Sequence, residues 1–562
     1  MKSTMEKKTI IIIFLSILTI GMGIFNVFLI PYIPPPIKLD LGSTLFVGTA
    51  SGPYTLDPID SWDIDSNAVL EQVVETLFFY DLNDLDLPRI NLLAESYFWE
   101  NLTTLHIKIR EGVRFHDNTP FNAEAARWNL HRLLYLTNSY GNNTGEIAHT
   151  RSLWLLSDKE TPIIKHIKIV GEYNITITLN APFAPLLNIL AYINAGMISP
   201  TAHANYENNL IHLQTEKLIG TGPYTFSRHT LGKEVVLSRW EGYWRNLAIF
   251  KKVKFLVYEE MDDLTNAMLS HQIDCFSLPQ YASYVLPFEN ISSIIIKNFT
   301  EDTGKSSLAY IYLGINNEQY NITWRKALFY AINYSYIIKE IRKEDCLRSN
   351  SPISPGFGLT FNESTQAPNY NITKAREIMV SMGFGNMSWS DSEWTSVAQS
   401  SSPFRTVPYQ YYRYFLNSFR ESLGNALIEW FKLIGVSSYF DDLIPFEPWM
   451  PWEPLLHIFQ SGWGPDYLDP YNMLEPLFNP LSSGNLAKIN DTTLTAMMQQ
   501  ALETIDDSAR NQIYKNIQSY NAEGFFRAPL YHPKLYFIHS ADIYGIPYNA
   551  MGKFQAYGMR RG

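Results

Sequence analysis

Apolar residues recur along this 562-residue chain with two periods that alternate from one end to the other. Stretches in which apolar and polar residues alternate predict strands, and stretches with apolar residues three or four positions apart predict amphipathic helices. The predicted strands are Leu45–Thr49, Thr104–Ile109, the hairpin Ile163–Val170 and Tyr173–Leu179, Glu234–Ser238, Lys252–Tyr258, Ala309–Asn316, Leu455–Phe459 and Leu535–Ile543. The predicted helices are Ser66–Phe78, Asn122–Leu134, Pro182–Ile189, Leu264–Leu269, Trp324–Ile341 with Thr323 as its cap, Asn371–Gly383, Arg420–Leu433 and Asp506–Ala522. Because strands and helices alternate without a short repeat, the pattern predicts an α/β fold.

One loop carries the strongest candidate chemistry. The segment Ser461–Pro470, SGWGPDYLDP, follows the predicted strand Leu455–Phe459. Glycines on both sides of Trp463 suggest a strand end where the backbone turns and comes close to another group. The Trp463 indole and the Asp466 carboxylate could there offer a flat wall and one anchoring charge. The same residues could instead form a connecting turn with a packed tryptophan and a solvated aspartate.

The N-terminus has the composition of a membrane anchor. Lys2, Lys7 and Lys8 precede Ile10–Ile30, which is 21 residues long and carries no charge. That length spans a bilayer, and the lysines place the short N-terminal side in the cytoplasm. We therefore expect residues 1–36 to form a cytoplasmic tip, an uncleaved membrane helix and a proline-rich spacer, with the body of the protein outside the cell membrane. A cleaved signal peptide is the competing interpretation.

Composition argues against nucleic-acid binding and against cysteine-based metal or redox motifs. The chain has 44 basic and 55 acidic residues, a net charge of −11, which is not the footprint of a nucleic-acid-binding protein. The acidic balance weakly favours a cationic or zwitterionic ligand. Cys275 and Cys346 are the two cysteines, and their wide spacing excludes a zinc ribbon or a CxxC redox motif. They could form one disulfide or remain as two buried free thiols.

Glycosylation sequons are frequent in the chain. Asn-x-Ser/Thr occurs eleven times, more often than the asparagine content alone suggests. The excess is typical of an extracellular, glycosylated body. The sequons begin at Asn101, Asn142, Asn174, Asn290, Asn298, Asn321, Asn333, Asn362, Asn371, Asn386 and Asn490.

Motifs of common enzymes are absent from the sequence. It contains neither HExxH nor GxSxG, and its histidines show no metal-ligand spacing. Gly304-Lys305-Ser306 has the form of a P-loop end, but Phe299 occupies the position of the required first glycine. The sequence therefore predicts a protein that is not an enzyme and that holds no metal and no cofactor.

Five segments in colinear order resemble the motifs of one family. They are GVRFHDNTPFNAEAARWNL from Gly112, IGTGPYTF from Ile219 with EGYW from Glu241, INNEQYNITWRKALFYAIN from Ile315, YNITKAREIMVSMGF from Tyr370, and SGWGPDYLDP from Ser461. From about Leu45 to Gly558 the chain resembles the extracellular solute-binding proteins of peptide-type ABC importers, the dipeptide/oligopeptide-binding family. Two residues depart from the family pattern: Asn118 stands where glycine is favoured, and both tolerate a positive φ, while Asn333 stands where aspartate is usual.

The resemblance implies a periplasmic-binding-protein-like fold of two lobes that close on a ligand about a hinge with two crossings. Lobe I would comprise 40–75, 219–304 and 533–562, with an accessory subdomain at 76–218, and lobe II would comprise 305–532. The hinge would lie near Gly304–Ile315 and Arg527–Lys534. Gly220 and Gly222 of the GTGPY motif would form a tight structural turn.

The resemblance also implies a ligand site. The aspartate of the loop motif binds a peptide's α-ammonium in the family, and an ammonium sealed from water needs an anion close by. The ligand-binding residues implied by this motif are Gly462, Trp463, Asp466 and Tyr467. Arg405, or Arg413, could bind the ligand's carboxylate, or could be an ordinary surface arginine.

An aromatic cluster runs from Trp389 to Trp452 and has two possible roles. Its side chains could line an adaptable cavity or stack on sugar rings, or they could be core packing. The cluster consists of Trp389, Trp394, Phe404, Tyr409, Tyr411, Tyr412, Tyr414, Phe415, Trp449 and Trp452.

The predicted function is that of a monomeric, membrane-tethered extracellular receptor that binds peptides and delivers them to an ABC permease. An oligosaccharide receptor of the same fold is the first alternative, because aromatic residues are abundant. An anchored surface hydrolase is the second, and the missing nucleophile and metal motifs count against it.

Overall fold

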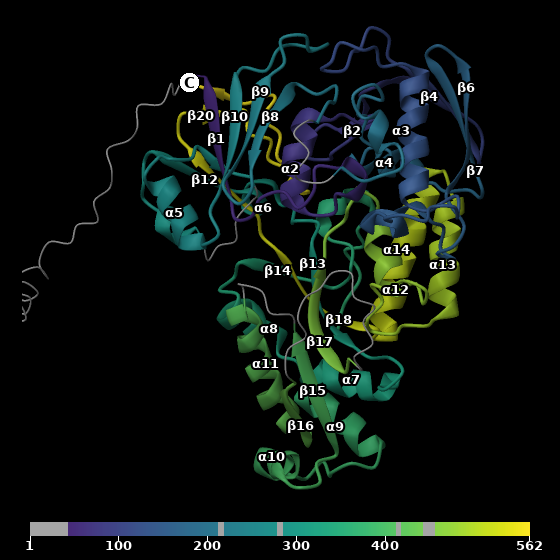
Figure 1. Ribbon diagram of the computed structural model, residues 1–562. Helices are drawn as coiled ribbons and strands as arrows, with labels where there is room; N and C mark the ends of the chain where they lie inside the picture. Colours follow the sequence, from purple (N-terminus) through teal and green to yellow (C-terminus); the bar gives the residue numbers. More distant parts are fainter. Residues whose placement is uncertain (1–42, 212–217, 278–284, 412–416, 442–455) are drawn as a thin grey trace, which may run out of the picture.

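Two β-sheets with helices packed beside them organise the chain (Figure 1). The computed structural model describes residues 43–211, 218–277, 285–411, 417–441 and 456–562. The first sheet has the strand order β12 (Ile294–Asn298), β19 (Tyr536–Ser540), β11 (Cys275–Phe276), β1 (Thr44–Thr49), β10 (Lys252–Val257), β9 (Glu234–Arg239) and β8 (Tyr224–Thr230). Strand β1 runs parallel to both of its neighbours and is buried along its whole length, so it forms the centre of this lobe.

The second sheet forms the lower lobe in Figure 1. Its strand order is β14 (Cys346–Arg348), β18 (Arg527–Pro533), β13 (Tyr310–Ile315), β17 (Ile458–Trp463), β15 (Arg405–Tyr411) and β16 (Val436–Phe440). The helices of this lobe are α7 (Ile322–Ala331), α8 (Tyr334–Tyr336), α9 (Ile372–Ser381), α10 (Asp391–Gln399) and α11 (Asn417–Lys432). The chain passes between the two sheets at residues 299–309, which include α6 (Phe299–Thr303), and at residues 534–535.

A smaller unit packs beside the first sheet. It contains a four-stranded antiparallel sheet in the order β4 (Ala94–Asn101), β5 (Thr104–Ile109), β7 (Asn174–Leu179) and β6 (Ile164–Gly171). The short pair β2 (Phe78–Tyr80) and β3 (Arg89–Asn91) and the helices α3 (Ala123–Leu136) and α4 (Leu186–Ile189) complete it. Its buried side chains form one continuous hydrophobic core with those of the first sheet.

Three helices of the predicted lobe II range pack with this first core. They are α12 (Pro470–Phe478), α13 (Thr492–Glu503) and α14 (Asp507–Gly524), and Figure 1 shows them below the β6–β7 hairpin. The backbone of Ala184 donates a hydrogen bond to Leu502 across the contact, and Lys159 forms an ion pair with Glu475 at 2.6 Å. Buried polar contacts therefore join the accessory unit to the helices that follow β17.

Several predicted elements agree with the structure. Strand β5 has the predicted bounds, and the β6–β7 hairpin lies within one residue of its prediction. Asn122 caps α3, with its Oδ1 accepting a hydrogen bond from the amide of Ala125 at 3.1 Å. Asn118 adopts a φ of 66°, the left-handed conformation that its place in the motif requires.

The prediction for the first helix was wrong at both ends. Helix α2 (Ile64–Val73) is capped by Asp63, whereas the Ser66 hydroxyl accepts a hydrogen bond from the amide of Thr55. The helix stops because Val74 is extended and the Gly222 amide bonds to the carbonyl of Val73 at 3.0 Å. A Cβ on Gly222 would lie 2.7 Å from the backbone of α2, so this glycine has the structural role expected of it.

The long helix predicted at Trp324–Ile341 is three shorter pieces. Asn321, not Thr323, caps α7 by accepting hydrogen bonds from two amides. The backbone becomes extended at Ile332, and the Asn333 side chain then accepts a hydrogen bond from the amide of Tyr336, which starts α8. An asparagine that competes for backbone donors in this way ends one helix and begins the next.

The ends of three other predicted elements differ from those in the structure. Helix α4 covers only the second half of the predicted Pro182–Ile189, and helix α5 (Met261–Leu269) begins three residues early. The predicted last strand is divided between β19 and β20 (Ile543–Tyr544), which pairs with β21 (Arg560–Arg561).

The two cysteines lie in different sheets. Cys275 belongs to β11 of the first sheet and Cys346 to β14 of the second, and both are buried free thiols. Burial raises the pKa of the Cys346 thiol to about 12, so it is an unreactive core residue.

Within the described residues, no helix is long and apolar enough to cross a membrane. The predicted anchor Ile10–Ile30 lies outside these residues, because the description begins at residue 43.

Candidate ligand site

The candidate loop begins where a central strand of the second sheet ends. Strand β17 runs further than predicted, through Gly462 to Trp463, and pairs antiparallel with β13. A Cβ on Gly462 would lie 2.6 Å from Ile311, so the glycine lets the neighbouring strand pack closely. The turn begins only at Gly464, which is exposed. Gly462 thus lies within the strand, and its part is to let β13 pack closely beside the start of the loop.

A buried asparagine shapes the loop. The Trp463 indole donates a hydrogen bond to the backbone carbonyl of Asn472 at 2.8 Å. The Asn472 side chain accepts from the backbone N–H of Asp466 at 2.7 Å and donates to its carboxylate at 3.1 Å. Asn472 is 2% exposed and lies in the first turn of α12, which Asp469 caps. No sequence motif singles out Asn472, because its role depends on the path of the loop back onto α12.

Asp466 is a partly desolvated carboxylate. Burial raises its pKa to about 6, and the hydrogen bond from Asn472 opposes part of that shift. In the part of the chain that the structure describes, no lysine, arginine or histidine forms an ion pair with Asp466. A carboxylate held in this state is stabilised when a cationic group approaches it.

Asp466 faces a cavity of about 650 Å³ that lies between the lobes. One wall is the turn after β17, which contributes Gly464, Pro465 and Asp466. The segments that cross between the sheets contribute Ser307, Leu308, Ala309 and Leu535. The rest of the lining comes from the first lobe, chiefly the end of β1, the start of α2, Tyr192 and residues 550–554. This volume accommodates a small solute rather than a single ion.

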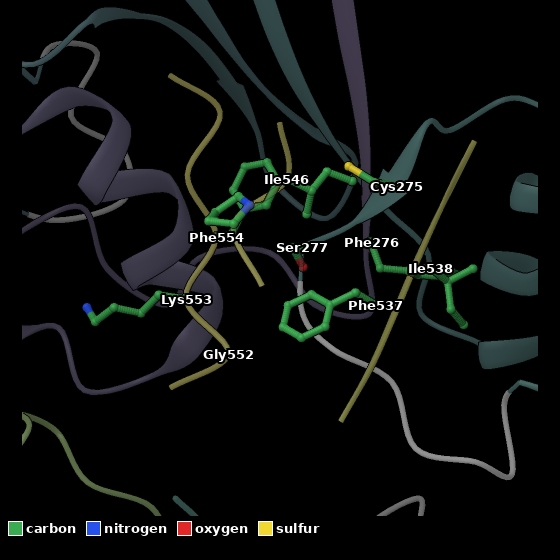
Figure 2. A pocket seen from close by; sticks show the side chains of 10 residues that line it. Cys275, Phe276, Ser277, Phe537, Ile538, Ile546, Gly552, Lys553 and Phe554 are labelled. Atoms are coloured by element: carbon green, nitrogen blue, oxygen red, sulfur yellow. The ribbon is translucent and has the colours of Figure 1, made fainter. Parts of the chain in front are cut away.

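A much smaller pocket adjoins the cavity (Figure 2). It holds about 20 Å³, room for about one water molecule, and shares Ser277, Gly552, Lys553 and Phe554 with the larger cavity. Figure 2 shows the Lys553 side chain extending away from this pocket toward a neighbouring helix. The Lys553 ammonium contacts the carboxylate of Glu71 on α2, so this charge is already paired.

Two other predicted site residues do not line the cavity. Tyr467 is 2% exposed and belongs to the core, where burial raises the pKa of its phenol well above the usual range. The Trp463 indole is half-buried and packs against the same core. Their described contacts give both residues the role of holding the loop in place.

Arg405 lies away from the cavity, at the start of β15. Its guanidinium donates to the carbonyl of Gln319 at 2.8 Å and stacks 4.0 Å above the Tyr320 ring and 5.1 Å from that of Trp324. These contacts explain its position without a ligand, and they do not support its predicted part in binding a carboxylate. Arg413 lies outside the described residues.

The described aromatic residues near Arg405 pack on one another. Trp389, Trp394 and Phe404 have ring centroids 5.4 to 6.3 Å apart, and Trp394 is fully buried. Tyr409 is also buried in this core. The interpretation as core packing therefore holds for these four. The side chain of Tyr411 and the whole of Tyr412, Tyr414, Phe415, Trp449 and Trp452 lie outside the description.

Acidic, histidine and cysteine side chains are the groups with which proteins most often bind metal ions. Among the residues described by the structure, no three of them come together in a way that could hold a metal ion.

Two lobes, two chain crossings among the described residues and a solute-sized cavity between the lobes define a two-lobe α/β binding protein of the periplasmic type. The sequence profile of the bacterial extracellular solute-binding proteins, family 5, matches residues 90–485. The chain belongs to this family, whose members bind solutes, as the five colinear motifs indicated.

Relatives and solved structures agree with this assignment. A glutathione-binding protein, GsiB, of Shigella flexneri is 26% identical over 510 residues, which cover 89% of this chain and 91% of that protein. The Helicobacter pylori protein DppA, solved with the peptide STSA, superposes with a TM-score of 0.74 at 19% identity, covering 92% of this chain and 98% of DppA. A Pseudoalteromonas dipeptide-binding protein, solved with Met-Leu, has the same TM-score and identity and covers 92% and 100% of the two chains. The similarity to the solved structures establishes the two-lobe fold.

Proposed function

We propose that this protein is a membrane-tethered extracellular receptor that binds peptides between its two lobes and delivers them to an ABC permease. The observation that carries the proposal is Asp466, a carboxylate at the cavity wall whose pKa burial raises to about 6 and which has no cation beside it in the described structure. A free peptide N-terminus supplies the missing charge and N–H donors. The peptide-like ligands named for the relatives, glutathione and short peptides, support the same class of ligand.

A ligand screen tests this proposal. Ligands that bind only the folded protein raise its melting temperature, and the rise grows with the logarithm of the ligand concentration relative to its dissociation constant. We expect short peptides with free N-termini to raise the melting temperature and oligosaccharides to leave it unchanged. A rise with oligosaccharides alone would favour the sugar receptor. That alternative receives no support from the described residues of the aromatic cluster between Trp389 and Tyr409, which pack in the core and do not line the cavity.

Membrane tethering is a separate part of the proposal. It rests on the 21 uncharged residues Ile10–Ile30 and on the absence of a small-residue cleavage site after them. We expect the mature protein to keep this segment at the outer face of the cell membrane. A mature N-terminus between residues 31 and 38, found by N-terminal sequencing, would contradict the tether.

Glycosylation is proposed on the exposed sequons. Asn101, Asn142 and Asn386 are exposed, whereas Asn362 uses its amide group to bond the backbone and a side chain of α14. Intact-mass measurement before and after enzymatic removal of N-glycans should show the modification. Equal masses would contradict it.

Closure of the lobes is proposed from the two crossings between the sheets. Ligand binding should bring the sheets together about residues 299–309 and 534–535, and small-angle scattering should show a smaller radius of gyration. The same radius at saturating ligand would indicate a rigid scaffold. Delivery to a permease, as a monomer, is best tested by co-purification of the receptor with membrane components encoded near its gene.

A further inference from the structure

The cavity between the lobes is lined by an unequal number of positive and negative side chains. Among the described residues that line it, the charged side chains are Asp63, Asp65, Glu71 and Asp466 on the acidic side and Lys553 on the basic side. The Lys553 ammonium is paired with Glu71. The remaining three carboxylates have no ion-pair partner in the chain as far as the structure describes it. An empty cavity of this kind carries a negative potential that the surrounding low-dielectric walls strengthen.

Two of these carboxylates stand at the start of α2. The Oδ1 atom of Asp63 accepts a hydrogen bond from the amide of Ser66 at 2.7 Å and caps the helix. Its Oδ2 atom is buried and has no hydrogen-bond partner among the described residues. The Asp65 carboxylate accepts hydrogen bonds from the hydroxyls of Thr49 and Ser51.

The position at a helix start has a consequence for the ligand. The N-terminus of a helix favours negative charge, which partly offsets the cost of burying the carboxylates of Asp63 and Asp65. The same helix end cannot serve an anionic group of a ligand, because these two side chains already occupy it. Burial raises the pKa of both carboxyl groups, and for Asp65 the charge of Asp63 raises it further. Both groups therefore lack sufficient counter-charge in the empty cavity.

Tyr192 lies close to acidic groups from both sides of the cavity. Its side chain lines the cavity, and its hydroxyl donates to the carbonyl of Ser61 at 3.2 Å. Burial raises the pKa of its phenol well above the usual range, and the negative charges of Asp466, Glu71 and Asp63 raise it further. The carboxylate from the loop after β17 and those from α2 thus surround the same space.

We propose that this cleft selects peptides that carry a basic side chain in addition to the α-ammonium, and that Asp63 and Asp65 determine this specificity. The inference rests on the proposed function, since it assigns the class of peptide to the same cavity. A ligand with one ammonium would compensate Asp466 and leave the two carboxylates of α2 desolvated without a counter-charge. A lysine or arginine side chain would compensate them, whereas an acidic side chain would be repelled.

Three matched tripeptides test the inference by titration calorimetry on the full chain in detergent. Ala-Lys-Ala carries the second cation, its Nε-acetyl-lysine analogue removes that charge with little change of shape, and Ala-Glu-Ala reverses it. We expect Ala-Lys-Ala to bind roughly tenfold more tightly than the acetylated analogue, and Ala-Glu-Ala to bind most weakly. The preference should shrink as salt is added.

Variants then assign the preference to the two residues. Asp63→Asn keeps a residue that caps helices well, and Asp65→Asn keeps the shape of the side chain. Combined, these substitutions should bring the affinity ratio of Ala-Lys-Ala to its acetylated analogue close to one. Asp262→Asn is the matched control, because Asp262 is an exposed acid in the first turn of α5 that does not line the cavity. It should leave the ratio unchanged.

The outcomes separate the inference from the function on which it rests. Equal binding of the three tripeptides by the native protein would overturn the inference and leave the peptide receptor standing. An unchanged ratio in the double variant, or equal loss of all three peptides, would also overturn it. If no peptide with a free N-terminus bound at all, the proposed function would fail, and the inference with it.

Discussion

The side-chain amide of Asn472 holds Asp466 on two sides. Its Oδ1 atom accepts the backbone N–H of Asp466 at 2.7 Å, and its Nδ2 atom donates to the Asp466 carboxylate at 3.1 Å. Because Asn472 is buried in the first turn of α12, the helix fixes both the path of the loop and the direction of the carboxylate. The carboxylate that we propose as the ligand anchor is therefore held in place before a ligand arrives.

Removal of this amide should weaken ligand binding. Asn472→Ala leaves the amide of Asp466 without its partner, and we expect the free energy of unfolding to fall by about 1–3 kcal/mol. Affinity for a free peptide should fall roughly tenfold, because the carboxylate loses its fixed position. Urea denaturation and calorimetry measure the two effects. Undiminished affinity in this variant would show that Asp466 does not need the support of Asn472.

Asn472→Asp provides the comparison for that variant. It keeps the shape of the side chain but places a second carboxylate beside Asp466, which should raise the pKa of Asp466 further. Peptide affinity near neutral pH should therefore fall, and the loss should become larger as the pH is lowered.

Peptide affinity should depend on pH through Asp466. The empty protein holds this carboxyl with a pKa of about 6, and the ligand ammonium binds its ionised form. Affinity should be highest near pH 7, because the α-ammonium of the peptide loses its own proton near pH 8, and should fall about tenfold between pH 7 and pH 5, as protonation of Asp466 competes with the ligand. Calorimetry across this range measures the profile. Asp466→Asn should remove the dependence, and a flat profile in the native protein would contradict the role of the carboxylate.

The raised pKa of Asp466 makes the stability of the empty protein change with pH in the direction opposite to peptide affinity: stability falls as the pH rises from about 4 to about 7. The folded-state pKa of Asp466 is raised above its ordinary value of 3.8, so the protonated form is the one that the fold favours. This contribution is fully present below about pH 4 and is lost as pH rises through about 6.

Arg405 should matter for stability rather than for binding. Arg405→Met removes the hydrogen bond to Gln319 and the stacking on Tyr320 and Trp324, and should lower the free energy of unfolding by about 0.5–2 kcal/mol. Peptide affinity should stay within about twofold of the native value. A loss of affinity for free peptides but not for peptide amides would restore Arg405 as the partner of the ligand carboxylate.

The buried pair of Asp469 and Arg510 should be a large contributor to stability. The Arg510 guanidinium donates two hydrogen bonds to the Asp469 carboxylate at 2.8 Å, and Asn188 of the accessory unit donates to the same carboxylate. Burial alone would lower the pKa of Arg510, but the charge of Asp469 raises it above the usual range. The pair thus joins α14 to the cap of α12 next to the ligand loop.

Asp469→Asn should therefore leave a buried arginine without its counter-charge. We expect the free energy of unfolding to fall by about 3–5 kcal/mol in urea denaturation. Glu377→Gln is the control, because Glu377 forms an exposed ion pair with Lys374 on α9, and it should leave stability almost unchanged. Similar small losses in both variants would show that the buried pair contributes no more than a surface pair.

Local sequence signals predicted elements wherever side chain and backbone act within a few residues. The period of two in Thr104–Ile109 and the cap at Asn122 both agree with the structure, because each depends only on neighbouring positions. The end of α2 could not be predicted from neighbouring residues, because it depends on the hydrogen bond from the amide of Gly222, far along the chain, to the carbonyl of Val73. The break in the helix after Asn321 is local, at Asn333, but the apolar period of the sequence runs across it and hid it.

The same distinction applies to the ligand site. The motif around Asp466 pointed to a carboxylate beside the cavity, but it did not show that Trp463 and Tyr467 face the core. The acidic wall at Asp63 and Asp65 and the supporting role of Asn472 arise from segments brought together only by folding. No spacing in the sequence connects them with the loop after β17.

The most direct test of the account compares free and N-acetylated peptides on the native protein and on Asp466→Ala. Closure should strip water from the carboxylate and the bound ammonium, and removal of one partner leaves the other buried, at about 2–5 kcal/mol. The substitution should weaken binding of a free peptide by roughly two to three decades, with almost no change in the melting temperature of the empty protein. The acetylated peptide should bind the native protein poorly and lose little further affinity. Equal calorimetric affinities of the native protein for the free and acetylated forms would contradict the role of Asp466, and with it the peptide receptor.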